Sequence, residues 1–207
     1  MDLRNVGNRV AVNLDSLNLR ISNEEALKIL ERKRIKCVKT DIFELAKNLV
    51  GVAQWRWGSK QWEAPYYFDC SALTKWLYGQ MGIWLPRRGE QQFEYCEKHG
   101  SIVNLDNYKR GDLLFLSSHF KNGVLIDFDD GIGHVCMVVE KNRAICSSNS
   151  ELGQGVVNLL FDDIFATRKL RAIGRVCDFC SLITLLVPPD REIESSDDIK
   201  HIILRSC

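Results

Sequence analysis

Apolar residues recur every three or four positions in the segment YYFDCSALTKWLYGQM at 66–81. This spacing gathers them on one face of a helix. Asp69 stands where the apolar pattern begins, and aspartate is a favoured helix N-cap. Gly82 follows the last apolar residue, and glycine commonly ends helices. The pattern therefore predicts a helix whose first residue is Cys70.

Capping and breaking signals predict three more helices. Ser22 or Asn23 is suited to cap a helix over 24–33, and Thr40 is suited to cap one over 41–50. Acidic residues stand in the first turn of both, as the helix dipole favours. A third helix is predicted after the proline and glycine that interrupt the segment LPRRGEQQ.

Alternating or continuous apolar runs predict strands in the rest of the chain. The run HVCMVV at 134–139, the polar EKNR and a second apolar run form a predicted β-hairpin, with both faces of its first strand buried. The other expected strands are one or two within 9–19, one within 108–116, and one each over 156–160 and 170–176.

The composition indicates a globular protein and argues against two classes of partner. The 207 residues are 45% hydrophobic and carry a net charge of +1, with acidic and basic residues mixed along the sequence. Such mixing gives no basic stripe for nucleic acid or an anionic membrane. The longest uncharged apolar run, 179–187, is too short to span a bilayer. The start lacks a signal core, so we expect a soluble chain, either cytoplasmic or released by a non-Sec route, of unknown oligomeric state.

Eight cysteines are too sparse in 207 residues to indicate a disulfide scaffold, and we expect them to be mostly reduced. Cys177 and Cys180 form a single CxxC without a second pair or a nearby histidine cluster. Zinc is therefore unsupported, and an isolated redox pair is the alternative to structural thiols, which are the simpler interpretation. The sequence indicates no metal site and no cofactor.

Cys70 and His134 are the candidate catalytic pair. A thiol in the first turn of a helix meets unpaired amides and the positive end of the helix dipole, which favour the nucleophilic thiolate. Such a nucleophile needs a base within hydrogen-bond reach. Only His134 sits in an ordered apolar context, since His99, His119 and His201 fall in predicted loop or tail segments. Taken singly, each of the two could instead be a structural residue.

Four blocks in order, FDCSALTKWLY, LPRRGEQQ, KRGDLLFL and GHVCMVV, resemble the signature blocks of the NlpC family of bacterial cell-wall cysteine peptidases. The resemblance covers roughly 40–176. It implies a papain-like α+β fold, with helices packed on an antiparallel β-sheet, in a domain at 40–187. An N-terminal arm at 1–39 and a polar, loosely held tail at 188–207 would flank this domain. The resemblance also makes Cys70 the nucleophile and His134 the base.

The resemblance further implies an activity, the hydrolysis of peptidoglycan stem peptides between D-γ-glutamate and the following diamino acid. The expected partner is thus a stem peptide or muropeptide, attacked through a thioester. Two alternatives remain open. One is an amidase or acyltransferase acting on another amide with the same pair. The other is a peptide-binding module that has lost efficient catalysis.

Four residues are candidates for substrate binding by resemblance. Asp69 and Ser71 flank the thiol, and Arg87 matches the arginine of the family's LPR block. Trp55 stands where the family usually has tyrosine, so a hydroxyl that could bind substrate or an oxyanion is missing. Asp69 and Ser71 also have the simpler alternative role of capping the helix.

The third catalytic residue stays open between Cys146 and Asn149. Family members use a polar residue, often histidine, about twelve positions after the base, which here is Cys146. A three-residue hairpin loop would place Ser148 opposite His134 and Cys146 diagonally on the same face. A two-residue loop would instead place Asn149 opposite His134, where its amide could fix the imidazole tautomer.

Overall fold

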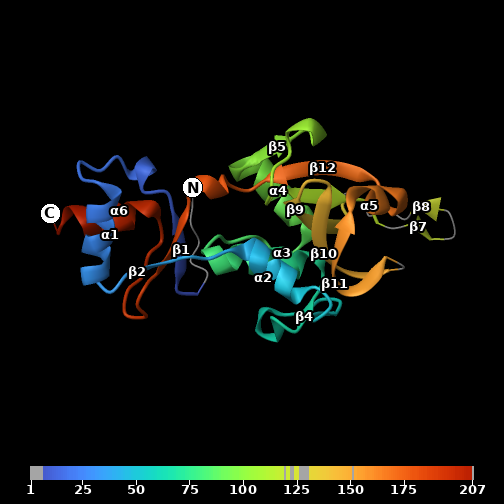
Figure 1. The fold of residues 1–207 in the computed structure, drawn as a ribbon, viewed down its shortest axis with the longest axis horizontal. Helices are drawn as coiled ribbons and strands as arrows, with labels where there is room; N and C mark the ends of the chain where they lie inside the picture. The colour runs from blue at the N-terminus through green and yellow to red at the C-terminus, as the bar shows by residue number, and fades with distance from the viewer. Residues whose placement is uncertain (1–6, 119, 122–123, 126–130, 151, 207) are drawn as a thin grey trace. The chain divides into compact units, whose positions relative to one another are not determined.

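The computed structural model describes residues 7–118, 120–121, 124–125, 131–150 and 152–206. The chain forms two compact units (Figure 1). The terminal unit consists of Met1–Ile42, Tyr78–Trp84 and Asp178–Cys207, and the central unit consists of Phe43–Leu77 and Leu85–Cys177. All the predicted catalytic residues belong to the central unit.

The central unit is built on a six-stranded antiparallel sheet with the order β11-β10-β9-β6-β12-β5. Figure 1 shows β9, β10 and β11 side by side. The expected α+β fold with an antiparallel sheet is therefore confirmed, and the predicted hairpin is β9–β10. The strands are β5 (Ser101–Val103), β6 (Leu113–Leu116), β9 (His134–Glu140), β10 (Arg143–Ser150), β11 (Gly153–Leu160) and β12 (Leu170–Arg175).

Helices pack on this sheet, α4 against β12 and α5 against β11. The helices are α2 (Ile42–Leu49), α3 (Cys70–Met81), α4 (Gly89–His99) and α5 (Phe161–Thr167). The predicted start of α3 at Cys70 is confirmed, and Gly82 follows its end with φ of 88°. Two small pairs complete the strands, β3 (Gln54–Trp55) with β4 (Tyr67–Phe68) and β7 (Phe120–Lys121) with β8 (Val124–Leu125).

The core lies where the central strands are apolar on both faces. All four residues of β6 and the first six of β9 are buried, as the continuous apolar runs predicted. Asp112, buried just before β6, accepts hydrogen bonds from the guanidinium of Arg175 at 2.8 and 2.9 Å. One core cluster joins the sheet to α5 and comprises Leu114, Leu116, Cys136, Val138, Ala144, Cys146, Phe161, Ile164 and Ile173.

The β9–β10 hairpin contains a bulge that sets its register. The chain turns at Asn142, whose φ of 58° lies in the left-handed region. Arg143 pairs with Glu140, but the next residue, Ala144, pairs with Val138, so one residue of β9 is left over. The loop therefore has two residues, while the strands beyond the bulge have the register of a three-residue loop.

The terminal unit contains a three-stranded antiparallel sheet with the order β1-β13-β2, together with two helices that contact each other (Figure 1). Its elements are β1 (Arg9–Val12), α1 (Asn23–Arg32), β2 (Lys36–Val38), β13 (Ile183–Leu186) and α6 (Ser196–Leu204). Ser22 caps α1 and forms a reciprocal capping box with Glu25, so Ser22 rather than Asn23 is the cap.

Both ends of the chain are more ordered than the sequence suggested. We expected a loosely held tail from 188 onwards, but α6 forms there and buries Ile199 and Ile203. These two residues are four apart, so they lie on one face of the helix. At the N-terminal end, only β1 forms in the stretch 9–19, followed by a short 3-10 helix at Asp15–Leu17.

Two findings concern the whole described chain. No helix among the described residues is long and apolar enough to cross a membrane. The cysteines that the structure describes are all free, namely Cys37, Cys70, Cys96, Cys136, Cys146, Cys177 and Cys180.

Candidate active site

Cys70 is held at the start of α3 by the residue before it. Asp69 is the N-cap, because its Oδ1 accepts a hydrogen bond from the backbone N–H of Ala72 at 2.8 Å. The Cys70 side chain is half-buried and lines a cavity. The sequence-predicted position of the thiol, in the first turn of a capped helix, is thus the observed one.

The Asp69 carboxylate is engaged on all sides by the protein. Its Oδ2 accepts the backbone N–H of Gly58 at 3.0 Å. The Arg87 guanidinium donates to both of its oxygens, at 2.9 Å to Oδ1, and also to Ser71 Oγ at 3.0 Å and to the Ser59 carbonyl at 2.8 Å. Arg87 therefore ties together the loop before the nucleophile and the first turn of α3.

Buried side chains fix the same turn to the neighbouring elements. Gln92, in α4, donates from Nε2 to the Ser71 carbonyl at 2.9 Å and accepts from Thr74 Oγ1 at 2.8 Å. Ser147, in β10, donates from Oγ to the Phe68 carbonyl at 2.8 Å. Sequence reasoning missed Gln92 as a positioning residue, although it is the last residue of the block LPRRGEQQ.

His134 begins β9 and is only 7% exposed. The preceding residue, Gly133, donates its N–H to the Leu116 carbonyl at 2.8 Å. A Cβ at Gly133 would lie 2.3 Å from Ser118 Oγ and 2.5 Å from the Ser118 backbone nitrogen. Only glycine allows the chain to pass Ser118 this closely, so Gly133 fixes where the imidazole enters the site.

The imidazole of His134 hydrogen-bonds to the thiols of both Cys70 and Cys146. Burial lowers the pKa of His134, but attraction to negative charge on Cys70 and Cys146 and the hydrogen bonds to both outweigh it. The pKa of His134 is raised to about 9 as a result. The site therefore favours a protonated imidazole placed beside the sulfur of the candidate nucleophile, as a cysteine nucleophile with its base requires.

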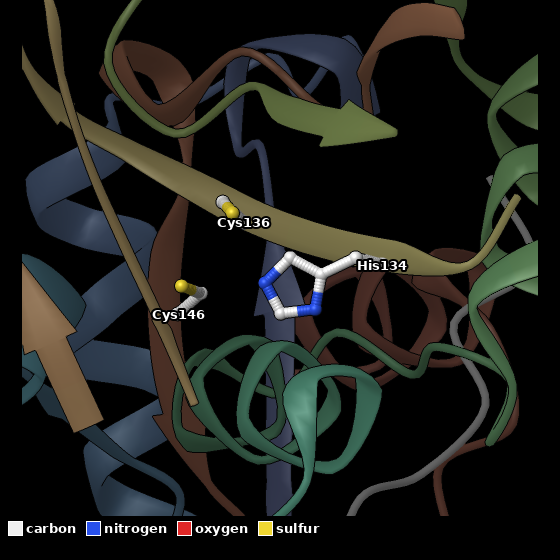
Figure 2. Close-up of side chains that lie close together, drawn as sticks. All are labelled: His134, Cys136 and Cys146. Atoms are coloured by element: carbon white, nitrogen blue, oxygen red, sulfur yellow. The ribbon is translucent and has the colours of Figure 1, made fainter. Parts of the chain in front are cut away.

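The hairpin bulge decides which residue reaches His134 from β10. Continuing the register beyond the bulge puts Ser148 opposite His134 and Cys146 diagonal to it on the same face. Figure 2 shows a ring nitrogen of His134 directed toward Cys146. Asn149 is exposed, and strand alternation puts it on the other face. Of the two open candidates, the structure brings Cys146 to the imidazole and not Asn149.

Cys146 has an environment that favours its thiolate. A hydrogen bond from Cys136 lowers the pKa of Cys146, against the effect of burial, and the neighbouring His134 charge lowers it further. The net pKa of Cys146 lies well below the ordinary thiol value, whereas burial raises that of Cys136. A thiolate accepts a hydrogen bond from an imidazolium better than a neutral thiol does, so Cys146 can orient the ring.

The nucleophile and base open on a cavity of about 380 Å³. Of the four candidates for substrate binding, Asp69, Ser71 and Arg87 line this cavity and Trp55 does not, while the binding roles themselves stay predictions. Trp55 lies in β3, half-buried, and Trp57 lines the cavity instead. The lining residues are Trp57, Gly58, Lys60, Asp69, Cys70, Ser71, Arg87, Arg88, Gly89, Glu90, Ile132, Gly133 and His134.

No sequence pattern predicts a role in the site for three other lining residues, Lys60, Arg88 and Glu90. Charged residues of this kind are usually solvated. Of the other histidines, His99 ends α4 and His201 lies in α6, while His119 is outside the described residues. The Cys70 thiol, the His134 imidazole and Cys146, arranged beside a cavity, form a site that can carry out acyl transfer.

Part of this chain is similar in sequence to curated proteins. A Bacillus subtilis protein named gamma-DL-glutamyl hydrolase is 33% identical over 135 residues, which cover 65% of this chain and 28% of that protein. A Listeria innocua protein named probable endopeptidase p60 is 30% identical over 89 residues, covering 43% of this chain and 15% of that protein. The matched part of the chain therefore spans less than a third of the length of these relatives.

Solved structures show the same fold. NlpC2 from Trichomonas vaginalis is 20% identical with a TM-score of 0.52, over 77% of this chain and 49% of that chain. An NlpC/P60 family protein from Bacillus cereus is 22% identical with a TM-score of 0.51, over 67% and 40%. The family model for NlpC/P60 matches residues 51–167, which is more than half of the chain and most of the central unit. The chain belongs to the NlpC/P60 family.

Proposed function

We propose that this chain is a cysteine peptidase that hydrolyses peptidoglycan stem peptides at the bond between D-γ-glutamate and the following diamino acid. The observation that carries the proposal is the Cys70–His134–Cys146 hydrogen-bonded row at the edge of a cavity. Membership of the NlpC/P60 family and the likeness to a gamma-DL-glutamyl hydrolase support the choice of bond.

The proposed reaction proceeds through a thioester. The Cys70 thiolate attacks the glutamyl carbonyl carbon, and a backbone N–H in the first turn of α3 stabilises the oxyanion. The His134 imidazolium gives its proton to the leaving amine as the carbon–nitrogen bond breaks. Neutral His134 then takes a proton from water, which attacks the thioester and releases the carboxylate and the Cys70 thiolate. Cys146 keeps the ring oriented throughout.

The charges around the cavity suit an anionic peptide. Lys60, Arg87 and Arg88 line it, against Asp69 and Glu90. Both acidic residues are paired with a neighbouring arginine, Asp69 with Arg87 and Glu90 with Arg88. Lys60 adds a further positive charge, so the lining is net cationic. A stem peptide carries carboxylates beside the scissile γ-glutamyl bond, and this complementarity supports the proposed substrate.

The test uses two synthetic stem peptides that differ only in whether the D-glutamate is linked through its γ- or its α-carboxyl group. The purified chain should cleave only the γ-linked peptide, and product masses identify the bond. Cys70→Ala should lower the rate by at least about 1000-fold, because it removes the nucleophile. Cys180→Ala, at an exposed cysteine, is the matched control and should keep the wild-type rate.

Two results would overturn the proposal. Equal product formation by wild type and Cys70→Ala would remove Cys70 from the chemistry. Cleavage of a different amide, or transfer of the acyl group to an added amine in place of water, would show that the pair serves an amidase or acyltransferase.

A further inference from the structure

His134, Cys136 and Cys146 form a buried group that we term the thiol–imidazole cluster. One ligand atom from each residue lies within 4.8 Å of the other two (Figure 2). His134 is 7% exposed, Cys136 is fully buried and Cys146 is 1% exposed. The proposed reaction uses His134 and Cys146, but it gives no role to the Cys136 thiol.

The donor set and its size fit a zinc ion. Two thiolates and one imidazole are ligands that zinc prefers, with Zn–S distances of about 2.3 Å and Zn–N distances of about 2.0 Å. In a tetrahedral site of these dimensions the sulfurs lie about 3.8 Å apart. The ligand atoms of the cluster therefore need to move by no more than about 1 Å to bind the ion.

Neighbouring strands hold the three side chains on one face of the sheet. Cys136 and His134 are two apart on β9, and the register beyond the bulge puts Cys146 opposite Cys136 on β10. Sequence spacing alone gave no metal signal, since it is the hairpin that brings the three together. His134 also lines the active-site cavity, which gives an ion a route into the cluster.

We propose that the thiol–imidazole cluster is a zinc-binding site and that zinc bound there inhibits the enzyme. On binding, Zn²⁺ forms bonds to the two sulfurs and to the ring nitrogen that faces Cys146. The Cys136 thiol and that ring nitrogen each lose one proton to solvent, and Cys146 binds as the thiolate. Water takes the fourth position. The site is distinct from the CxxC pair, in which Cys177 is buried and Cys180 is exposed.

Zinc should inhibit the enzyme because it fixes the protonation state of the His134 imidazole. With zinc on the nitrogen facing Cys146, the nitrogen facing Cys70 carries a fixed N–H. His134 then cannot accept a further proton, so it can neither form the imidazolium that protonates the leaving amine nor act as base toward water. This consequence rests on the proposed function, whereas metal binding itself does not. A chelator should restore activity.

Binding is tested on the full chain, first stripped of metal and kept reduced with a phosphine. Cobalt(II) serves as a probe, because thiolate ligands give it an intense charge-transfer absorption, and zinc affinity is measured by displacing the cobalt. We expect one equivalent to bind to wild type. Cys136→Ala and Cys146→Ser should each weaken binding by at least about 10- to 100-fold. Removing a residue that only hydrogen-bonds a metal ligand already costs this much affinity, and these two residues are ligands.

The control variant is the double change Cys177→Ser and Cys180→Ser, which should bind cobalt and zinc as wild type does. Thermal unfolding shows whether each variant is folded. Cys136→Ser serves as a second variant if Cys136→Ala does not fold. The absence of cobalt–thiolate absorption in wild type would overturn the proposal. So would binding that persists in folded Cys136→Ala, or binding that disappears in the control variant.

Inhibition is measured for each variant relative to its own rate in chelator. The zinc concentration that halves the rate should rise at least about tenfold in Cys136→Ala. An unchanged value would show that zinc acts on Cys70 and His134 alone, and would overturn the proposal. If wild type in chelator cleaves no γ-glutamyl peptide, the proposed function fails, and the cobalt spectra still decide whether the site exists.

Discussion

At the scale of single residues, the site depends on an imidazole placed between two sulfurs. Burial lowers the pKa of His134, whereas negative charge on the neighbouring cysteines raises it, and the net pKa is about 9. The balance decides whether the ring is protonated when the nucleophile attacks. It also links the protonation of one residue to the stability of the fold, because the unfolded chain lacks both neighbours.

Removing the Cys70 sulfur should lower the pKa of His134. Negative charge on Cys70 is the largest of the effects that raise this pKa from 6.5 to about 9. In Cys70→Ala that effect is absent, so burial lowers the pKa further than in wild type. NMR titration of the His134 ring in wild type and variant measures the change. An identical titration midpoint in both would contradict the proposed ion pair.

The same shift predicts how stability varies with pH. A group whose pKa is raised on folding stabilises the protein fully below its unfolded pKa, here about 6.5, and loses this contribution as the pH rises through about 9. Wild type should lose up to about 3 kcal/mol of unfolding free energy over that window. Urea titrations at several pH values in this window should show a smaller loss of unfolding free energy in Cys70→Ala than in wild type. A larger loss would refute the assignment of the raised pKa to the Cys70 charge.

The choice between the two candidate orienting residues is also testable. Cys146→Ala should lower kcat by roughly 10- to 100-fold with little change in KM, because it leaves the general base misoriented, whereas Cys146 itself does not line the cavity. It should also shift the pH–rate profile, which a purely structural defect would not do. Asn149→Ala, at an exposed position three residues on, should behave as wild type. The opposite pattern in steady-state kinetics would restore Asn149 as the orienting residue.

At the scale of elements, the sequence predicted most of the helices and strands that have a periodic apolar pattern or a capping residue. The helix starting at Cys70 with its Asp69 cap and the buried strand after His134 followed from residue patterns. The third catalytic position did not follow, because it depends on a bulge near Asn142 that no local pattern revealed. Gln92 was also missed, since a polar residue in a helix usually faces solvent, whereas here buried partners satisfy it.

Close approach between elements makes Gly133 sensitive to any side chain. Gly133→Ala would put Cβ within 2.5 Å of the Ser118 backbone, so the start of β9 must shift. We expect a loss of about 1–3 kcal/mol in unfolding free energy and a lower kcat, because His134 is the next residue. Gly89→Ala meets nothing closer than 3.7 Å and should not destabilise the protein. Chemical denaturation compares the two, and equal stability would contradict the steric argument.

At the scale of the whole molecule, the two units are interleaved along the chain. The chain passes between the terminal and central units after 42, 77, 84 and 177. The predicted division at 39/40 and 187/188 remains a prediction as a description of domains. A cut at 39/40 would separate β13 from both of its partner strands, β1 and β2, and a cut at 187/188 would remove α6, which contacts α1.

The C-terminal helix should matter for the stability of the terminal unit. Ile203 is fully buried, whereas the adjacent Leu204 is 49% exposed. Ile203→Asp would bury a charge and should cost about 3 kcal/mol or more, while Leu204→Asp should cost under about 1 kcal/mol. Hydrogen exchange in α1 and β13 should increase only in the first variant. Matching exchange in both would mean that α6 is indeed a loosely held tail.

The bulge in the β9–β10 hairpin has a consequence for how such enzymes diversify. Because side chains alternate along a strand, loss of a single codon between Ala144 and Cys146 would carry Cys146 to the opposite face and bring Asn149 across from His134. A lineage can therefore exchange a thiolate for an amide beside its catalytic base by a change in length, with no substitution at either position. Insertions and deletions in this hairpin, more than point mutations, should then be where the chemistry of the third residue is selected.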